Sequence, residues 1–241
     1  MPTALDLAFV TVLAVAWPLY ETFIDWPEFQ WRSRRNPSAA RLFEYRRSMA
    51  QQWVLAAVAL AIWAHAGRPW TALGLVSPPG WRLWMGFGVV AAFAALQAWQ
   101  VTAIARSPAT RAHLRKRMAE MKLASLLPHD RRELGWMMAL SLTAGFVEEL
   151  LFRGYIVAVL APWLGWWGAA ALGMAAFGVL HAYQGRAGIV RTAILGAVMT
   201  LLVAATGWLL PAILLHAVID VGSGTAAFLA LSQPPAEAST A

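Results

Sequence analysis

Long apolar stretches, separated by short polar or basic segments, make up most of the chain. A helix that crosses a bilayer needs about 20 mostly apolar residues, and seven stretches reach or approach this length. The pattern therefore predicts an all-α polytopic membrane protein with about seven transmembrane helices. The predicted spans are residues 5–23, 52–66, 82–104, a fourth span that begins near residue 134, 163–182, 189–206 and 208–231.

The composition narrows the class of protein further. Of the 241 residues, 60% are hydrophobic and only 13% are charged, whereas a soluble domain carries about 25% charged residues. This balance leaves little room for a separate soluble domain. The chain contains no cysteine, which excludes disulfides, thiolate metal ligands and cysteine nucleophiles.

Basic residues are concentrated on one side of the predicted topology. The net charge is +7, and most Lys and Arg residues lie in the segments 24–51, 105–133 and 183–191, which alternate with the spans. By the positive-inside rule, this distribution places the N-terminus outside and the C-terminus in the cytoplasm. We therefore interpret the positive charge as a topology signal rather than as a nucleic-acid-binding site. Part of the second basic segment, residues 109–127, is compatible with an amphipathic helix on the membrane surface. The basic residues that fall on the other side are Arg68, Arg82 and Arg153.

The fourth span contains three charged residues within six positions, Glu148, Glu149 and Arg153. Each charged side chain near the centre of a spanning helix costs roughly 2.5–3.5 kcal/mol on insertion scales, so a lipid-facing role is disfavoured. Glu149 and Arg153 are four residues apart and share a helix face, which predicts an ion pair. Glu148 lies about 100° round the helix and is predicted to be a carboxylate without that partner.

Two further polar pairs occur in the last spans. Phe177 and His181 are four residues apart, as are His216 and Asp220. Taken singly, His181 can be an interfacial histidine, and the His216–Asp220 pair can be a hydrogen-bonded contact between helices. Together with Glu148 they supply a base, imidazole partners and hydrogen-bond donors, which are the groups that activate a water molecule and stabilise an oxyanion.

These three motifs, in this order on successive spans, resemble those of the CAAX protease and bacteriocin-processing family, which is related to the type 2 CAAX prenyl endopeptidases. The resemblance implies a glutamate-type intramembrane protease. It also implies a catalytic core formed by the last four helices (residues 134–231). The residues before it (1–133) are predicted to form N-terminal transmembrane helices and basic cytoplasmic loops, and the proline-containing, polar C-terminal tail (residues 232–241) is predicted to be disordered.

The resemblance assigns roles to four catalytic residues. Glu148 would activate the water with the help of His181, whereas His216 and Asp220 would bind the carbonyl oxygen and stabilise the tetrahedral intermediate. The prenyl endopeptidases have asparagine where this chain has Asp220. An ionised Asp220 would repel an oxyanion, so this residue would instead orient His216 and keep it protonated, or be protonated itself.

Three further residues would support the architecture in the same family. These are Glu149, Arg153 and Phe177.

We favour a mechanism without a cofactor, because a glutamate and a histidine can activate water without a metal. A divalent metal such as zinc, bound by His181, His216 and Glu148, is the alternative. The expected partners are the lipid bilayer and a membrane protein or lipidated peptide as substrate, with no nucleic acid. The expected location is the inner membrane of a bacterium.

The predicted site requires bent or tilted helices. In straight spans with a rise of 1.5 Å per residue, His181 and His216 would differ in depth by roughly 10–15 Å. The positions expected to permit breaks are Gly185, Gly188 and Pro211.

Two other classes of function remain open from the residues alone. One is a non-catalytic membrane scaffold, chaperone or immunity protein of the same fold. The other is a proton-coupled transporter, which also uses buried carboxylates and histidines; the inverted repeats of many transporters are not evident in the sequence.

Overall fold

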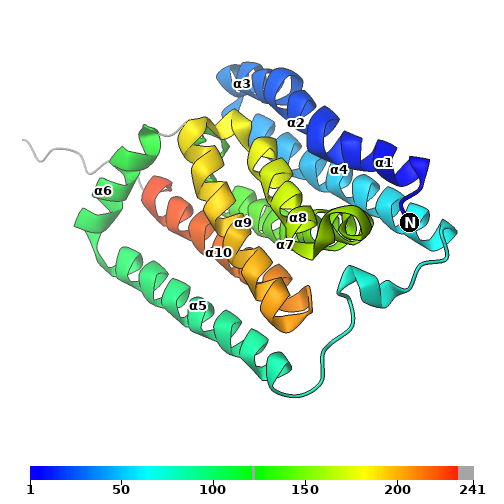
Figure 1. The fold of residues 1–241 in the computed structure, drawn as a ribbon. Helices are drawn as coiled ribbons and strands as arrows, with labels where there is room; N and C mark the ends of the chain where they lie inside the picture. The colour runs from blue at the N-terminus through cyan, green and yellow to red at the C-terminus, as the bar shows by residue number, and fades with distance from the viewer. Residues whose placement is uncertain (121–122, 233–241) are drawn as a thin grey trace, which may run out of the picture.

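The computed structural model describes residues 1–120 and 123–232, and in these ranges the chain forms helices and no strand (Figure 1). The all-α prediction is therefore confirmed. Three π-helical segments, Val12–Ala16, Glu21–Asp25 and Glu149–Tyr155, connect some of the α-helices without a break. The α-helices are α1 (Ala4–Thr11), α2 (Trp17–Tyr20), α3 (Trp26–Arg35), α4 (Pro37–His65), α5 (Trp81–Arg106), α6 (Pro108–Ala119), α7 (Arg131–Glu148), α8 (Ile156–Leu180), α9 (Arg186–Thr206) and α10 (Leu210–Leu231).

Five helical runs among the described residues are long and apolar enough to cross a membrane. One of them, Arg131–Leu180, has 50 residues. It changes direction at Gly165, whose φ of 67° lies in the left-handed region that favours glycine. Each of the seven predicted spans overlaps a helical run, but residues 66, 181–182 and 208–209 lie outside the α-helices, and the second span lies in α4, which is not among the five runs. The five runs are Ala4–Arg35, Trp81–Arg106, Arg131–Leu180, Arg186–Thr206 and Leu210–Leu231.

The segment predicted as the first basic loop, residues 24–51, is mostly helical. Helix α3 ends at Arg35, and α4 begins two residues later. The side chain of Asn36 caps α4 by accepting a hydrogen bond from the backbone N–H of Ala39 at 3.1 Å, and Pro37 occupies the first helical turn, where proline is well tolerated. Only the C-terminal part of α4 is continuously apolar in the sequence, so the loop was predicted to be too long.

The second basic segment contains a helix, as predicted, but a shorter one. Helix α6 begins after Ser107, whose Oγ accepts a hydrogen bond from the Thr110 N–H at 3.1 Å. It ends at Ala119 rather than at residue 127, and a short 3₁₀ turn, Ala124–Leu126, follows. Of the predicted tail, only Ser232 is among the described residues; residues 233–241 lie outside them.

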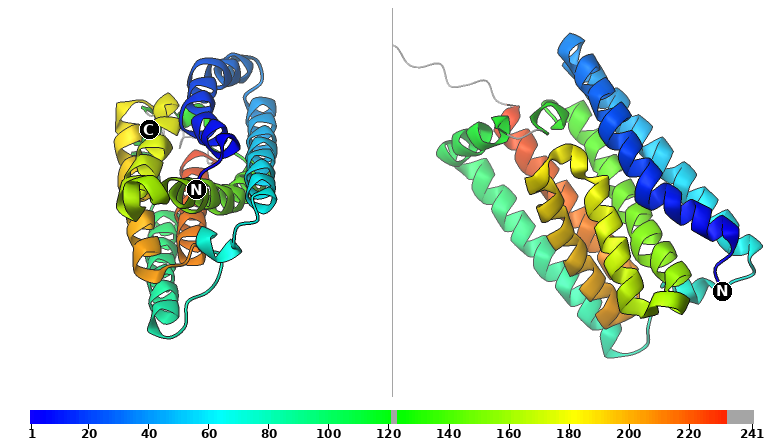
Figure 2. Two further views of the ribbon diagram at one scale, coloured as in Figure 1. Left: turned by 45° about the vertical axis from the view of Figure 1, so that its right-hand side comes forward. Right: turned by 45° about the horizontal axis from the view of Figure 1, so that its top comes forward.

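The segment with the two glutamates lies inside the bundle. Helix α7 packs against α4 on one side and against α10 on another, and α10 also contacts α5. Figure 2 shows the α1–α3 run lying along α4, at the side of the bundle away from α5. The polar motif is therefore surrounded by protein rather than by lipid.

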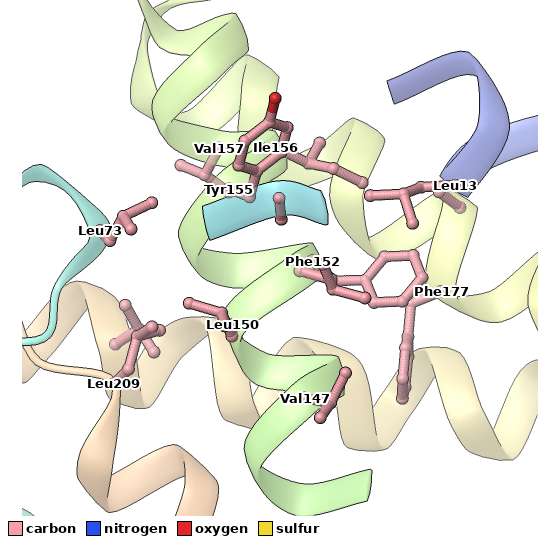
Figure 3. Packing of buried hydrophobic residues seen from close by; sticks show 14 of the residues in the cluster. Leu13, Leu73, Val147, Leu150, Phe152, Tyr155, Ile156, Val157, Phe177 and Leu209 are labelled. Atoms are coloured by element: carbon pink, nitrogen blue, oxygen red, sulfur yellow. The ribbon is translucent and has the colours of Figure 1, made fainter. Parts of the chain in front are cut away.

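Buried aromatic and aliphatic residues surround the π-helical segment after α7 (Figure 3). Phe152 is fully buried, and its ring contacts that of Phe177 with 5.3 Å between centroids. Trp17, from the N-terminal run, stacks on Phe152 at 6.3 Å. The N-terminal run thus packs against the core and covers it, although it is not one of the last four helices.

Candidate active site

The predicted ion pair between Glu149 and Arg153 is confirmed. Both residues belong to the π-helical segment, both are buried, and Arg153 Nη1 donates to Glu149 Oε1 at 3.0 Å. The guanidinium lies over the Phe177 ring at 4.2 Å. A Cβ on Gly196 would come within 2.8 Å of Arg153 Nη2, so the glycine in α9 leaves room for the guanidinium. Each charge offsets the cost of burying the other.

Glu148, the last residue of α7, pairs with no arginine among the described residues, as predicted. Its side chain is buried, and its Oε1 accepts a hydrogen bond from Gln52 Nε2 of α4 at 3.2 Å. Its Oε2 lies 3.9 Å from His216 Nε2 of α10. This carboxylate thus faces an imidazole rather than a guanidinium.

The His216 ring lies among three carboxylates. Its Nδ1 is 2.9 Å from Glu149 Oε1, so Glu149 serves both Arg153 and His216, a contact that helix periodicity does not predict. Its Nε2 is 3.5 Å from Asp220 Oδ2, which confirms that His216 and Asp220 share a face. When the ring is protonated, Nδ1–H bonds Glu149 and Nε2–H is directed between Glu148 and Asp220.

A glycine in α7 allows α10 to bring His216 close to the two glutamates. A Cβ on Gly145 would lie 2.9 Å from the carbonyl oxygen of Ile213 and 3.1 Å from the Cβ of Ala217. Contacts this short force neighbouring atoms to move. The absence of a side chain at Gly145 therefore sets how closely the two helices approach.

His181 follows the last residue of α8, and its Nδ1 is 2.9 Å from the carbonyl oxygen of Phe177. Its ring centroid is 4.8 Å from that of Phe177, and the His216 ring centroid is 6.1 Å from the same phenyl ring. The two imidazoles therefore contact one phenyl ring. No hydrogen bond joins His181 to Glu148 within the described part of the chain.

Two of the three expected helix breaks do not occur. Gly185, with φ 84°, does separate α8 from α9. Gly188 lies inside an uninterrupted α9, and Pro211 lies in the first turn of α10, where the missing N–H costs no hydrogen bond. The pronounced change of direction is instead at Gly165.

The predicted catalytic residues line one cavity of about 370 Å³. Side chains of α7, α8 and α10 meet there, together with residues of α4, α9 and the N-terminal run. The predicted convergence of three separate spans on a single pocket is thus confirmed. The predicted site residues in its lining are Glu148, Phe177, His181, His216 and Asp220.

Residues 1–133, which carry no part of the family motifs, contribute a wall of this cavity. Trp17, Glu21, Glu44 and Gln52 line it. Glu44, which precedes the apolar part of α4, accepts a hydrogen bond from Arg47 at 2.7 Å. Burial, and then the nearby charge of Glu21, raise the pKa of Glu44 to about 7.

The contact of Gln52 with Glu148 was not predicted from the sequence. The available signal was the amide pair Gln51–Gln52 at the start of an otherwise apolar span. Amide side chains in such a position need a polar partner inside the protein. Nothing in the sequence, however, says which helix supplies it.

No preformed metal site is found among residues 1–120 and 123–232. In this part of the chain, no group of three or more His, Cys, Asp or Glu side chains is arranged to hold a metal ion. The alternative ligand set of Glu148, His181 and His216 lines the cavity without such an arrangement. The absence of a cofactor stays a prediction.

Comparison with known protein families gives one match. Residues 130–222 match the family described as type II CAAX prenyl endopeptidase Rce1-like. The matched range contains all three motifs, from Glu148 to Asp220, and the predicted resemblance to this family is confirmed for these residues. No curated protein and no solved structure gives a match. Together with the five apolar helical runs, the family match identifies an integral membrane protein.

Proposed function

Since residues 130–222 belong to the Rce1-like family of type II CAAX prenyl endopeptidases, we propose that the protein is an intramembrane endopeptidase that uses a glutamate to activate water. The observation that carries this proposal is the position of Glu148. Its carboxylate pairs with no arginine in the described part of the chain, lines a cavity inside the helical bundle and lies 3.9 Å from His216 Nε2. A separation of 3.9 Å admits one oxygen atom that bonds both groups.

The proposed hydrolysis needs one proton acceptor and one hydrogen-bond donor. Glu148 takes a proton from water as the water oxygen bonds to the carbonyl carbon of the substrate. The carbonyl oxygen becomes an oxyanion, which receives a hydrogen bond from His216 Nε2–H. When the C–N bond breaks, the proton held by Glu148 passes to the leaving nitrogen.

The other polar residues hold these two groups in place. Glu149 accepts from His216 Nδ1 at 2.9 Å, which supports an imidazole whose Nε2 faces the cavity. We assign Asp220, whose Oδ2 is 3.5 Å from Nε2, the role of orienting the ring until the developing oxyanion accepts the Nε2–H bond. His181, whose Nδ1 is engaged with the Phe177 carbonyl, presents Nε2 to the cavity and assists Glu148 in orienting the water.

The proposed reaction requires no resident metal, because the glutamate and the histidines supply both proton transfer and oxyanion stabilisation. If a divalent metal were bound, Glu148, His181 and His216 would be the side chains to hold it, and it would polarise the bound water.

The proposed substrate is a membrane protein or lipidated peptide that is cleaved near its anchored end. The cavity lies among helices that are apolar enough to span a bilayer, so a substrate anchored in the same bilayer reaches it without leaving the lipid. We propose the bacterial inner membrane as the location, with the C-terminus in the cytoplasm.

The test is the replacement Glu148→Gln, which keeps the shape of the side chain and removes the proton acceptor. We expect cleavage to fall by about 10²–10⁴-fold or more. Cleavage is measured with the purified protein and a fluorogenic peptide that ends in a farnesylated CAAX sequence. In parallel, the membrane proteomes of wild-type and variant strains are compared for uncleaved C-terminal or leader fragments.

The matched control is Glu28→Gln, which changes a half-exposed carboxylate outside the cavity and should retain wild-type activity. A chelator added to the wild-type protein should leave cleavage intact. Full activity of a folded Glu148→Gln protein would refute the mechanism. Unchanged biological function in a Glu148/His181 double variant would favour a non-catalytic scaffold instead.

A further inference from the structure

One polar contact to Glu148 comes from outside the matched family segment. Gln52 lies in α4 and is only 6% exposed. Its Nε2 donates to Glu148 Oε1 at 3.2 Å, and both residues line the cavity. The two positions are 96 residues apart in the sequence, so the bond depends on how α4 packs against α7.

This bond divides the two oxygens of the Glu148 carboxylate between two partners. Oε1 is held by the amide of Gln52, whereas Oε2 is 3.9 Å from His216 Nε2. A glutamate side chain has several rotatable bonds, and a catalytic carboxylate must be held within about 0.5 Å of its working position. The contact from α4 restricts rotation of the carboxylate and directs Oε2 toward the imidazole.

The other end of the amide supports the same interpretation. Gln52 Oε1 is buried and has no hydrogen-bond partner among the described residues. Leaving a buried amide oxygen without a partner is unfavourable. The amide nevertheless directs its N–H donor, and not this oxygen, toward Glu148, because a carboxylate oxygen accepts hydrogen bonds.

We propose that Gln52 is a positioning residue for the proposed hydrolysis, and that it acts by holding the Glu148 carboxylate in the orientation in which Oε2 faces His216. The role rests on the proposed function, because it acts through the residue that activates water. Gln52 does not contact the reacting atoms in this role.

The chain offers a matched pair of variants, Gln52→Met and Gln51→Met. Methionine has nearly the volume of glutamine but no N–H donor. Gln51 is the neighbouring residue on α4; it also lines the cavity, but no hydrogen bond joins it to Glu148 in the described structure. We expect Gln52→Met to lower kcat by about tenfold or more, since small misplacements of a catalytic group have effects of this size. KM should change by less than about twofold, because the replaced amide makes no contact with the substrate in this role.

A second measurement does not depend on catalysis. Glu148 in the purified, full-length protein is labelled with dicyclohexylcarbodiimide, and the adduct is quantified by mass spectrometry with Glu44 in the same cavity as internal reference. We expect labelling of Glu148 to rise about fivefold in Gln52→Met, the effect of losing one hydrogen bond. Gln51→Met should leave the labelling of Glu148 at the wild-type level.

The outcomes separate the two proposals. Equal labelling of Glu148 in the wild type and in Gln52→Met would overturn the positioning role, whether or not the peptide is cleaved. A fall in kcat of the same size in Gln52→Met and Gln51→Met would also overturn it. The loss of activity would then come from changing this part of α4 and not from losing the hydrogen bond to Glu148. If labelling responds to Gln52→Met but wild-type protein cleaves nothing, the proposed function fails and Gln52 still positions Glu148.

Discussion

At the scale of single residues, the central feature is Glu149, which accepts hydrogen bonds on one oxygen from both Arg153 and His216. This arrangement neutralises one carboxylate of the adjacent pair and leaves Glu148 to face the cavity. The same contacts fix the direction of the His216 ring. Charges that would be costly in lipid thus face opposite charges in a small network, although Glu149 Oε2 and Arg153 Nε and Nη2 have no hydrogen-bond partner among the described residues.

The network predicts a large cost for removing Arg153. The variant Arg153→Met leaves the Glu149 carboxylate buried without its guanidinium, and breaking a buried pair in this way costs about 3–5 kcal/mol. Unfolding in mixed detergent micelles measures the loss. In the double variant Glu149→Gln/Arg153→Met the loss should be smaller than the sum of the two single losses, because the pair acts as a unit.

A surface pair provides the comparison. Arg32 and Glu28 form an ion pair whose carboxylate side chain is 42% exposed, and exposed pairs contribute about 0–1 kcal/mol. Arg32→Met should therefore change the free energy of unfolding little. If Arg153→Met changed the free energy of unfolding equally little, Arg153 would not compensate the buried charge of Glu149.

At the scale of helices, the site depends on the close approach of α7 and α10. Gly145 faces the backbone of α10, with the carbonyl oxygen of Ile213 only 2.9 Å from where its Cβ would stand. His216 lies within one turn of that contact. The distance between Glu148 and His216 is therefore set by two helices whose contact tolerates no side chain at this point.

The variant Gly145→Ala tests this dependence. The added methyl must push α10 away, at a cost of about 1–3 kcal/mol for overpacking, and it should lower cleavage because His216 moves away from Glu148. Gly135→Ala on the same helix is the control, because a Cβ there meets nothing within 4 Å. That change should be neutral or stabilise α7 by up to about 1 kcal/mol. Equal activity of the two variants would contradict the proposed role of helix spacing.

At the scale of the whole molecule, both halves of the chain build the cavity. The matched family segment covers residues 130–222, yet Trp17, Glu44 and Gln52 also line the space around Glu148. The start of the N-terminal run is tied to the connector after α4 and to the core, since Asp6 pairs with Arg68 and accepts from Tyr155 Oη at 2.8 Å. Removing the first helices would therefore open the site.

The orientation of the molecule in the membrane can be tested directly because the chain has no cysteine. We predict that a cysteine at the exposed position Ser77 reacts with a membrane-impermeant maleimide in intact cells, since Ser77 lies in the connector on the side with few basic residues. A cysteine at Ala109, an exposed position in α6, should react only after the membrane is permeabilised. The opposite result would place the N-terminus inside.

The helices, the Glu149–Arg153 pair and the shared faces of Phe177 with His181 and of His216 with Asp220 follow from the sequence alone. Each depends on neighbours within about one helical turn, and helix geometry brings such neighbours together in any context. The resemblance to the family motifs further predicted that these pairs belong to one site.

Tertiary structure alone decided the bonds between helices. The contacts of Gln52 with Glu148 and of Glu149 with His216 join residues 96 and 67 positions apart, and the turn at Gly165 gives one long helical run two directions. Such contacts depend on how far apart packed helices lie and how they are rotated about their axes. Periodicity along one chain segment carries no information on either quantity, so the partners of Glu148 could be found only in the folded protein.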